Sequence, residues 1–365
     1  MTQIKQVISF LEKWAPPSLQ ESYDNSRLIV GDDFKEVTNV LVSLDCTEEI
    51  IDEALAKGAN LVVCHHPIVF KGLKSFTGKT YVERTVIKAI QNNVAIYAIH
   101  TNLDSVLDGV SGKIAEKLGL ENVKILRSSP GKLKKIVVFS PESCANEVRS
   151  AMFEAGAGAI GDYEECSFNS KGDGTFKAGV LADPFVGNIG ESHIEPEIKI
   201  ESVCPDFLVG RVIEAAVKKH AYEEVAYDVF STDNVHSKYG LGVVGDLKTP
   251  LAGEDFLRMT KKSLATECVR HTQIPSKKIE KVAVCGGAGG FLLDDAKAAG
   301  ADVLVTADFK YHEFFDARDS VMIADVGHFE SEQFTIDLLH DRISEKFSNF
   351  AVLKTEVNTN PINYF

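Results

Sequence analysis

Short apolar runs alternate with amphipathic stretches in the first third of the chain. The runs at 38–45, 60–64 and 93–99 are rich in valine and isoleucine, whereas the apolar residues of 48–58 and 82–92 recur with helical spacing. Strands that alternate with helices predict crossover connections and a largely parallel sheet.

The last third of the chain repeats this pattern. Apolar runs at 281–287, 302–308 and 321–327 are separated by helical stretches, and one long helix is predicted at about 329–346. The N-terminal and C-terminal thirds therefore predict an α/β fold, in which two lobes with largely parallel or mixed sheets form one core.

The middle third has a different order of elements, β-α-β-β-α-β, which is typical of a ferredoxin-like domain. The predicted strands lie at 134–140, 165–170, 197–202 and 223–230, and the helices at 142–156 and 207–220. Because this segment begins and ends with a strand, it can fold as an inserted domain with neighbouring termini. We expect an N-terminal lobe at 1–130, the insert at 131–235 and a C-terminal lobe at 236–365.

Composition and charge limit the classes of partner. The chain has 365 residues, of which 44% are hydrophobic, so it can bury a core. Its formal net charge of −14 repels phosphate backbones, so we expect no nucleic-acid partner. No apolar run approaches the roughly 18 residues of a membrane span, and we expect no membrane partner. The seven cysteines include no C-x-x-C pair and the N-terminus lacks a signal-peptide pattern, which together favour a cytoplasmic protein.

Two adjacent histidines directly follow the predicted strand 60–64. Neighbouring residues within a strand point to opposite faces, but His65 and His66 lie at its end, where Pro67 breaks the strand pattern. Both rings can then turn into the crevice at the carboxyl end of the sheet, where α/β proteins bind ligands. The alternative is one surface histidine and one packed, hydrogen-bonded histidine.

Acidic residues and a third histidine follow two further strands. Asp104 lies shortly after the strand 93–99, and it is either a metal ligand or part of a local turn. His328 and Glu332 open the last predicted helix at a spacing of four, so they share one helix face and can chelate a metal. The alternative for this pair is a capped helix start, where the helix dipole stabilises acidic groups.

Taken together, these five residues suit two metal ions better than one. Three histidines and two carboxylates exceed the three or four protein ligands of a single catalytic zinc. Two ions about 3.5–4 Å apart would activate water and clamp an oxyanion or a phosphate. Mixed nitrogen and oxygen ligands admit Zn, Mn, Fe, Ni or Co, so the identity of the divalent ions stays open.

Two secondary features follow other strands of the last third. The glycine loop 285–290 lies between a strand and a helix, and is either a phosphate-binding loop or simply a tight turn. Asp308 and His312 end another strand and are candidates for acid–base catalysis or for orienting a metal ligand. The alternative for this pair is a helix cap and an exposed histidine.

The chain resembles the Nif-three-like family, whose members are called GTP cyclohydrolase I type 2 homologues. The resemblance rests on motifs that occur in order in both terminal thirds, namely 21–32, 45–75, HTNLD (100–104), VCGGAGG (284–290), TADFKYH (306–312) and GHFESE (327–332). The middle third resembles the PII/CutA-like domain inserted in the longer bacterial members, most clearly at 220–228.

The resemblance implies a dinuclear metal site on His65, His66, Asp104, His328 and Glu332. It also implies a homohexameric ring with the sites facing an interior cavity, and the hydrolytic opening of the GTP imidazole ring. Since a family does not fix a substrate, three hypotheses remain open. The chain is a metal-dependent hydrolase of a nucleotide or another small, phosphate-bearing molecule, a non-enzymatic metal-handling protein, or a regulatory protein whose PII-like insert binds an effector or partner.

Overall fold

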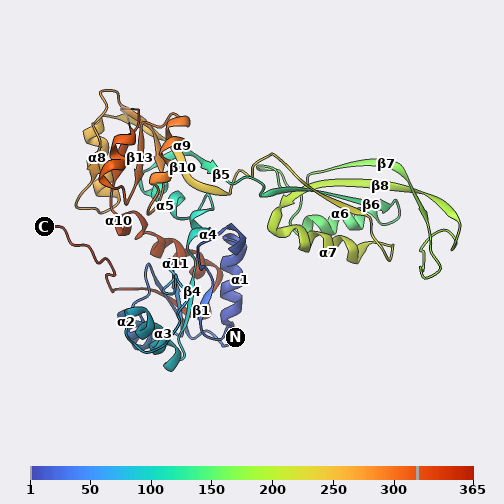
Figure 1. Cartoon of the computed structure of the whole chain (residues 1–365), viewed down its shortest axis with the longest axis horizontal. Helices are drawn as coiled ribbons and strands as arrows, with labels where there is room; N and C mark the ends of the chain where they lie inside the picture. Colours follow the sequence, from blue (N-terminus) through green and yellow to red (C-terminus); the bar gives the residue numbers. More distant parts are fainter. Residues whose placement is uncertain (1, 318–319) are drawn as a thin grey trace. The chain divides into compact units, whose positions relative to one another are not determined.

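The computed structural model describes residues 2–317 and 320–365, which form two compact units (Figure 1). The first unit is discontinuous in sequence and combines the chain up to Arg127 with Lys238–Phe365. The second unit is the segment between them, Ser128–Ser237. The chain thus has the mixed α/β class that its sequence predicts.

A five-stranded sheet organises one half of the first unit. Its strands, in spatial order, are β1 (Leu28–Val30), β4 (Ala95–Ala98), β3 (Leu61–Cys64), β2 (Asn39–Ser43) and β15 (Ala351–Lys354). The last four are parallel, and β1 is antiparallel to β4. The helices that accompany this sheet are α1 (Ile4–Trp14), α2 (Glu48–Ala56), α3 (Tyr81–Gln91) and α11 (Thr335–Lys346), and α4 (Thr101–Asp104) follows β4.

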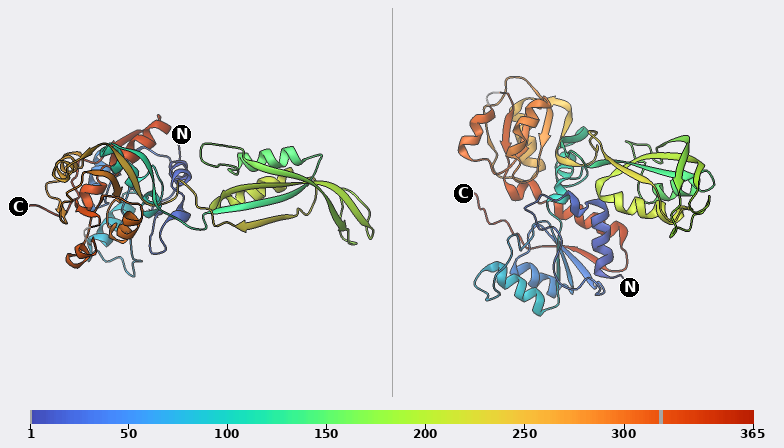
Figure 2. Two further views of the ribbon diagram at one scale, coloured as in Figure 1. Left: turned by 90° about the horizontal axis from the view of Figure 1, so that it is seen from above. Right: turned by 45° about the vertical axis from the view of Figure 1, so that its right-hand side comes forward.

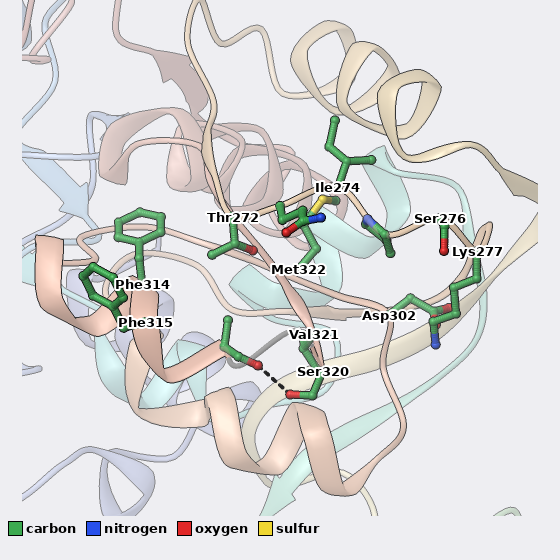
Figure 3. A pocket seen from close by; sticks show the side chains of 13 residues that line it. Thr272, Ile274, Ser276, Lys277, Asp302, Phe314, Phe315, Ser320, Val321 and Met322 are labelled. Carbon is green, nitrogen blue, oxygen red and sulfur yellow. Dashed lines mark hydrogen bonds and ion pairs between the residues drawn. The ribbon is translucent and has the colours of Figure 1, made fainter.

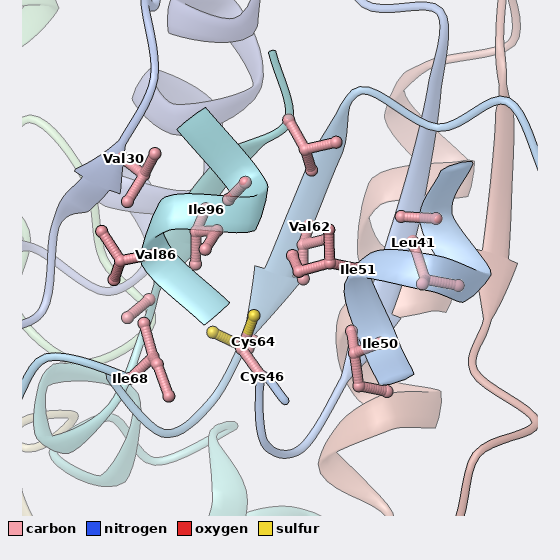
Figure 4. Close-up of a cluster of buried hydrophobic side chains, with 14 of the residues drawn as sticks. Val30, Leu41, Cys46, Ile50, Ile51, Val62, Cys64, Ile68, Val86 and Ile96 are labelled. Carbon is pink, nitrogen blue, oxygen red and sulfur yellow. The ribbon is translucent and has the colours of Figure 1, made fainter. Parts of the chain in front are cut away.

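The predicted strands of the first third are confirmed, and their continuous apolar runs have a physical reason. β3 and β4 are buried along their whole length, as expected for parallel strands covered on both faces. Figure 4 shows one covered face, where Ile50 and Ile51 of α2 and Val86 of α3 pack over Val62 and Ile96 of the sheet.

A six-stranded sheet organises the other half of the first unit. Its strands, in spatial order, are β11 (Arg270–His271), β14 (Met322–Asp325), β13 (Val303–Thr306), β12 (Ile279–Val284), β10 (Gly240–Leu251) and β5 (Leu120–Ser128). The three predicted strands of the last third, β12, β13 and β14, are parallel, whereas β10 is antiparallel to β12 and β11 is antiparallel to β14. The helices here are α5 (Val110–Lys117), which contacts β10 and β12, α8 (Gly253–Ser263), α9 (Leu293–Ala298) and α10 (His328–Glu332), with 3-10 turns at Gly290–Leu292 and Tyr311–Ala317.

The two halves exchange strands, which the sequence pattern does not predict. β5 lies before the insert but joins the six-stranded sheet, and β15 lies near the end of the chain but joins the five-stranded sheet. The single long helix expected at 329–346 is wrong, because α10 and α11 are separated at Gln333 and Phe334. At this break, the side-chain Nε2 of Gln333 donates to the backbone carbonyl oxygens of Leu264 and Glu330.

The second unit has the predicted order of strands and helices. Its elements are β6 (Leu133–Pro141), α6 (Ala145–Glu154), β7 (Ser167–Lys177), β8 (Ser192–Pro205), a 3-10 turn at Asp206–Leu208, α7 (Val209–Lys219) and β9 (Tyr227–Ser231). The spatial order is β7-β8-β6-β9, and Figure 2 shows the long hairpin of β7 and β8 within this unit. That the segment is an independent ferredoxin-like insert bounded at 131 and 235 stays a prediction.

No helix in the described ranges 2–317 and 320–365 is both long enough and apolar enough to cross a lipid bilayer.

Candidate metal centre

Two histidines leave the carboxyl end of β3 and turn their rings into one polar cluster. The His65 side chain is fully buried, and its Nδ1 donates to the carbonyl oxygen of Ile99, at 2.8 Å. The His66 Nδ1 donates to Asp45 Oδ1, also at 2.8 Å. Asp45 follows the neighbouring strand β2, so the ends of parallel strands supply both the ligand candidates and their acceptors.

The first turn of α10 supplies the opposite side of the cluster. Gly327 has φ 93°, a left-handed conformation in which the chain turns from β14 into α10. Glu332 Oε2 lies 3.1 Å from His328 Nε2 and 2.9 Å from His66 Nε2. The predicted His/Glu pair therefore shares one helix face, and it faces His66 across 262 positions of sequence.

Asp104 at the end of α4 completes the predicted set. Its Oδ1 lies 3.6 Å from His65 Nε2, which is itself 3.9 Å from Glu332 Oε1. All five predicted side chains thus come together from β3, α4 and α10. Three groups within the cluster have donor atoms close enough to share a cation: His65 with His66 and His100, His66 with His328 and Glu332, and His65 with Asp104 and Glu332.

His100 belongs to this cluster, although it was not among the five ligands expected from sequence. It directly follows β4, and its Nδ1 donates to Asp24 Oδ1 at 2.7 Å. The signal that would have identified it is its position, because His65 and His66 follow the neighbouring parallel strand in the same way.

The four histidines share one hydrogen-bonding pattern. Each Nδ1 is bound to an oxygen acceptor: the Ile99 carbonyl for His65, Asp45 for His66, Asp24 for His100 and Asp308 for His328. A proton held on Nδ1 leaves the lone pair on Nε2, which is the atom that faces the cluster. Histidines that bind metals in proteins are oriented in this way by a second hydrogen bond.

Atoms without partners show that the residues fit a cation. His65 Nε2 and Asp104 Oδ1 are buried and have no hydrogen-bond partner among the residues that the structure describes. His66 Nε2 and His328 Nε2 lie 3.4 Å apart and both contact Glu332 Oε2, so these three atoms also converge on one point. Buried polar atoms without partners are costly, and a divalent cation would satisfy these donor atoms together.

Burial and mutual charge shift the pKa values of the cluster in opposite directions. Burial lowers the pKa of His65 to about 3, and burial together with the charge of Glu332 raises the pKa of Asp104 to about 7. For His328, contacts with Glu332 and Asp308 outweigh burial and raise the pKa to about 9. The metal-free cluster therefore retains a proton near Glu332, and cations must displace it.

The two further candidates for catalysis, Asp308 and His312, have different surroundings. Asp308 Oδ2 accepts a hydrogen bond from His328 Nδ1 at 2.7 Å, which matches its expected role in orienting a ligand. His312 is exposed, and its ring packs against Tyr311 and Phe315. No contact within the described part of the chain joins His312 to the cluster, so its acid–base role is unsupported.

The glycine loop has another role than binding phosphate. Its amide groups are used internally, because Gly287 donates to Ser331 Oγ and Gly289 donates to Thr306 Oγ1, both at 2.9 Å. A Cβ at Gly287 would lie 2.3 Å from Glu332 Oε1. The loop is therefore a tight turn whose backbone packs against a ligand candidate.

A cleft of about 460 Å³ opens beside the cluster. Its walls include His100, Asp104, His328 and Glu332 together with Glu21, Tyr23, Thr101, Arg127, Leu241, Cys285, Gly286, Ala288 and Phe291. Arg127 is held by Asp295, from its Nε to Oδ2 at 2.9 Å, and stands over the Phe291 ring. The cleft thus joins the cluster to an aromatic wall with one guanidinium group.

A separate cavity of about 770 Å³ lies at the amino ends of β13 and β14 (Figure 3). Thr272, Lys277, Asp302 and Met322 are among its walls, and none of the five candidate ligands lines it. Since ligands of parallel sheets bind at the carboxyl ends of the strands, this cavity is the weaker candidate site.

Comparisons with known proteins identify the family of the chain. The family model Duf34/NIF3 (NGG1p interacting factor 3) matches residues 2–361. The chain is 38% identical to a "GTP cyclohydrolase 1 type 2 homolog" of Halalkalibacterium halodurans, over 98% of each chain, and 35% identical to the Bacillus subtilis protein of the same name, over 99% of this chain and 98% of that one. A crystal structure of a Bacillus cereus protein related to NIF3 superposes with a TM-score of 0.87 at 37% identity, covering 100% of this chain and 99% of the other. The chain belongs to the Duf34/NIF3 family.

Proposed function

We propose that this chain is a metal-dependent hydrolase that holds two divalent cations on His65, His66, Asp104, His328 and Glu332. The observation that carries the proposal is the common orientation of the histidines. Each Nδ1 is bound to an outward acceptor, and each Nε2 is directed toward the two carboxylates. Side chains that served only packing would have no reason to share this arrangement.

The two oxygen atoms of Glu332 support two cation positions. Oε2 lies close to His66 and His328, whereas Oε1 is on the side of His65, which in turn faces Asp104. Glu332 belongs to both groups of donor atoms, so its carboxylate would bridge the two ions. His100 adds a further nitrogen on the side of His65 and His66.

Two divalent ions in such a site would lower the pKa of bound water and polarise an oxygen atom bonded to the atom that the water attacks. The residues of the chain prepare the site for this chemistry. Asp45 and Asp308 keep a proton on Nδ1 of His66 and His328, and thereby keep Nε2 free to bind. The full burial of His65 and the near-complete burial of Glu332 exclude bulk water from one side, so that solvent and substrate would enter through the cleft.

The substrate that fits the proposal is a nucleotide or a related small molecule. The cleft offers the exposed ring of Phe291 for stacking and the guanidinium of Arg127 for an anionic group. The names of the Halalkalibacterium and Bacillus relatives point in the same direction, so GTP is the first substrate to test.

The proposal is tested by measuring turnover and metal content together. The purified chain, loaded in turn with Zn, Mn, Fe, Ni or Co, is given a panel of nucleotides that includes GTP. We expect turnover with at least one metal and its loss in His66→Ala, while His312→Ala, which alters an exposed histidine outside the cluster, stays active. A metal-loaded chain that turns over no member of the panel would contradict the enzymatic part.

A non-enzymatic metal-handling role is the second candidate, because one side of the cluster is open. The side chains of His328 and Asp308 are 35% and 50% exposed, respectively. A ligand within reach of solvent favours exchange of the ion with an acceptor. This role predicts metal transfer to a chelator within seconds and no turnover, whereas slow release over hours would contradict it.

The proposal includes the homohexameric assembly that the family resemblance implies. Light scattering on the purified chain should give about six times the 39.9 kDa mass of one chain. A monomer at micromolar concentration would contradict this part and leave the metal centre unaffected.

A further inference from the structure

The second unit contains a cavity of its own, which the proposed function does not use. Its volume is about 380 Å³, and it lies beside the loop between β7 and β8. The walls are Phe139, Gly174, Thr175, Phe176, Lys177, Ala178, Gly179, Ala182, Pro184, Phe185, Val186, Glu197, Tyr222, Glu223, Glu224 and Ala226. Aromatic rings and carboxylates thus dominate one small space.

The aromatic rings of the cavity are arranged around Tyr222. The centroids of Phe176 and Phe185 lie 6.4 Å and 6.3 Å from the centroid of Tyr222, with interplanar angles of 54° and 49°. Phe139 on β6 contributes a fourth ring to the walls. These rings thus line one cavity at an angle to one another, and the face of an aromatic ring carries the negative part of its quadrupole.

A carboxylate lies against the backbone on one wall. A Cβ at Gly174 would stand 2.3 Å from Glu197 Oε2, so the Glu197 carboxylate lies directly against the Gly174 backbone. Glu223 Oε1 accepts a hydrogen bond from the Asp183 amide at 2.9 Å, which ties the β7–β8 loop to the far wall. The described residues that line this cavity carry a net negative charge. They include three carboxylates, those of Glu197, Glu223 and Glu224, and one ammonium group, that of Lys177.

The Tyr222 hydroxyl is buried beside the Glu197 carboxylate. Burial first, and then the adjacent Glu197 carboxylate, raise the pKa of Tyr222. The ring therefore lies in a region of negative potential, which an incoming cation would relieve.

We propose that this cavity binds a small organic cation of the alkylated-ammonium class, with its methyl groups against the rings of Phe176, Phe185 and Tyr222 and with Glu197 as its counter-charge. Aromatic faces beside a carboxylate are the general means by which proteins bind such cations. The cavity volume is sufficient for a molecule of about ten heavy atoms. This site is independent of the metal centre and of its proposed activity.

Other occupants fit these walls less well. An anion would meet three carboxylates at close range. A divalent metal ion needs several donor atoms within reach of one another, and among the described residues the groups that meet this requirement all lie in the metal centre. A neutral apolar molecule would bury the Glu197 carboxylate without a counter-charge, which is costly.

The charge requirement is tested by calorimetric titration of the full-length chain with an isosteric pair. Choline carries the ammonium charge, and 3,3-dimethylbutan-1-ol has the same shape without it. We expect saturable binding of choline with one site per chain. The alcohol should bind more weakly than choline, by about tenfold or more. The proposal would be overturned by equal affinities for the two compounds, or by the absence of choline binding at concentrations up to about 20 mM.

Substitutions locate the binding. Glu197→Gln keeps the shape of the side chain and should weaken choline binding about tenfold, and Phe176→Leu should weaken it too. Glu147→Gln on the exposed side of α6 is the matched control and should bind like the unaltered chain. Circular dichroism of each variant verifies folding. Unchanged choline affinity in folded Glu197→Gln would overturn the assignment of the site.

Discussion

The backbone of Gly287 packs directly against the carboxylate of Glu332. A Cβ at Gly287 would lie 2.3 Å from Glu332 Oε1 and 3.1 Å from a ring carbon of His328. Gly287 also has φ 57°, in the left-handed region that glycine adopts without strain. The glycine loop therefore forms a wall that holds the Glu332 carboxylate beside His66 and His328.

This contact predicts that Gly287→Ala will displace Glu332 and weaken metal binding. The expected loss of affinity is about tenfold or more, because the substitution moves a ligand rather than a surface group. Gly300→Ala is a matched control, since Gly300 has φ 69° but a methyl group there would meet no described atom within 4 Å. Both variants bear the strain of a left-handed alanine, so equal metal affinity in a competition titration would contradict the role given to Gly287.

A second prediction concerns the acceptors behind the histidines. Asp45→Asn removes the negative charge that orients His66, and Asp45 is itself held by the Thr359 hydroxyl at 2.6 Å. We expect a loss of metal affinity of about 10–100-fold with the fold retained. Asp33→Asn, a substitution at a partly buried position outside the cluster in the same unit, should bind metal like the unaltered chain. Isothermal titration with the metal that the chain binds most tightly distinguishes the two.

Removal of metal should destabilise the chain. A ligand that binds only the folded state stabilises it by about 2.7 kcal/mol when its concentration is one hundred times the dissociation constant. We therefore expect the melting temperature to fall after dialysis against EDTA and to recover when metal is returned. The same treatment should leave the melting temperature of His66→Ala unchanged, and a shift of equal size in this variant would show that metal binds elsewhere.

The strands β2, β3, β4, β12, β13 and β14 could be predicted because parallel strands covered on both faces carry uninterrupted apolar runs. The histidine pair was also predictable, because polar residues directly after such a run have few structural reasons to be there. β1 and β15 were not predicted, since the three and four residues of these edge strands are only partly buried and lack a distinctive pattern. Local pattern likewise does not reveal that β5 and β15 cross to the sheet of the other half.

The convergence of the five candidate ligands was predictable, but the contacts that support them were not. His65, His66, Asp104, His328 and Glu332 each follow a strand, and the ends of parallel strands meet. The supporting contacts are those of Asp45 with His66, of Asp24 with His100 and of Gly287 with Glu332. Each joins segments that are remote in sequence. Spacing along the chain carries no information about such distances, and for the same reason the loop of Gly287 resembled a phosphate-binding loop.

A fourth prediction uses a carboxylate remote from the metal centre. Asp302 is nearly buried, accepts from the amides of Glu280 and Lys281, and pairs with Lys277 at 2.6 Å. Burial alone would raise its pKa, but Lys277 and these amides outweigh burial and lower it. Because the pKa is lower in the folded state, the charged form stabilises the fold at pH values above about 4, its ordinary pKa, and this stabilisation is lost as the pH falls further.

Asp302→Asn should therefore reduce the free energy of unfolding by about 1–3 kcal/mol at pH 7. The reduction should be much smaller at about pH 3. Urea denaturation across this range measures the difference. Asp294→Asn, whose side chain is 91% exposed beside Lys297, should change stability by less than about 0.5 kcal/mol at either pH. A constant difference for Asp302→Asn at all pH values would contradict the linkage.

The central claim is tested most directly by crystals of the metal-loaded chain measured at the absorption edge of the bound metal. The account predicts two anomalous peaks about 3.5–4 Å apart on the two sides of the Glu332 carboxylate, one beside His66 and His328 and the other beside His65 and Asp104. A fully loaded crystal with a single peak, or with its peaks away from Glu332, would contradict it.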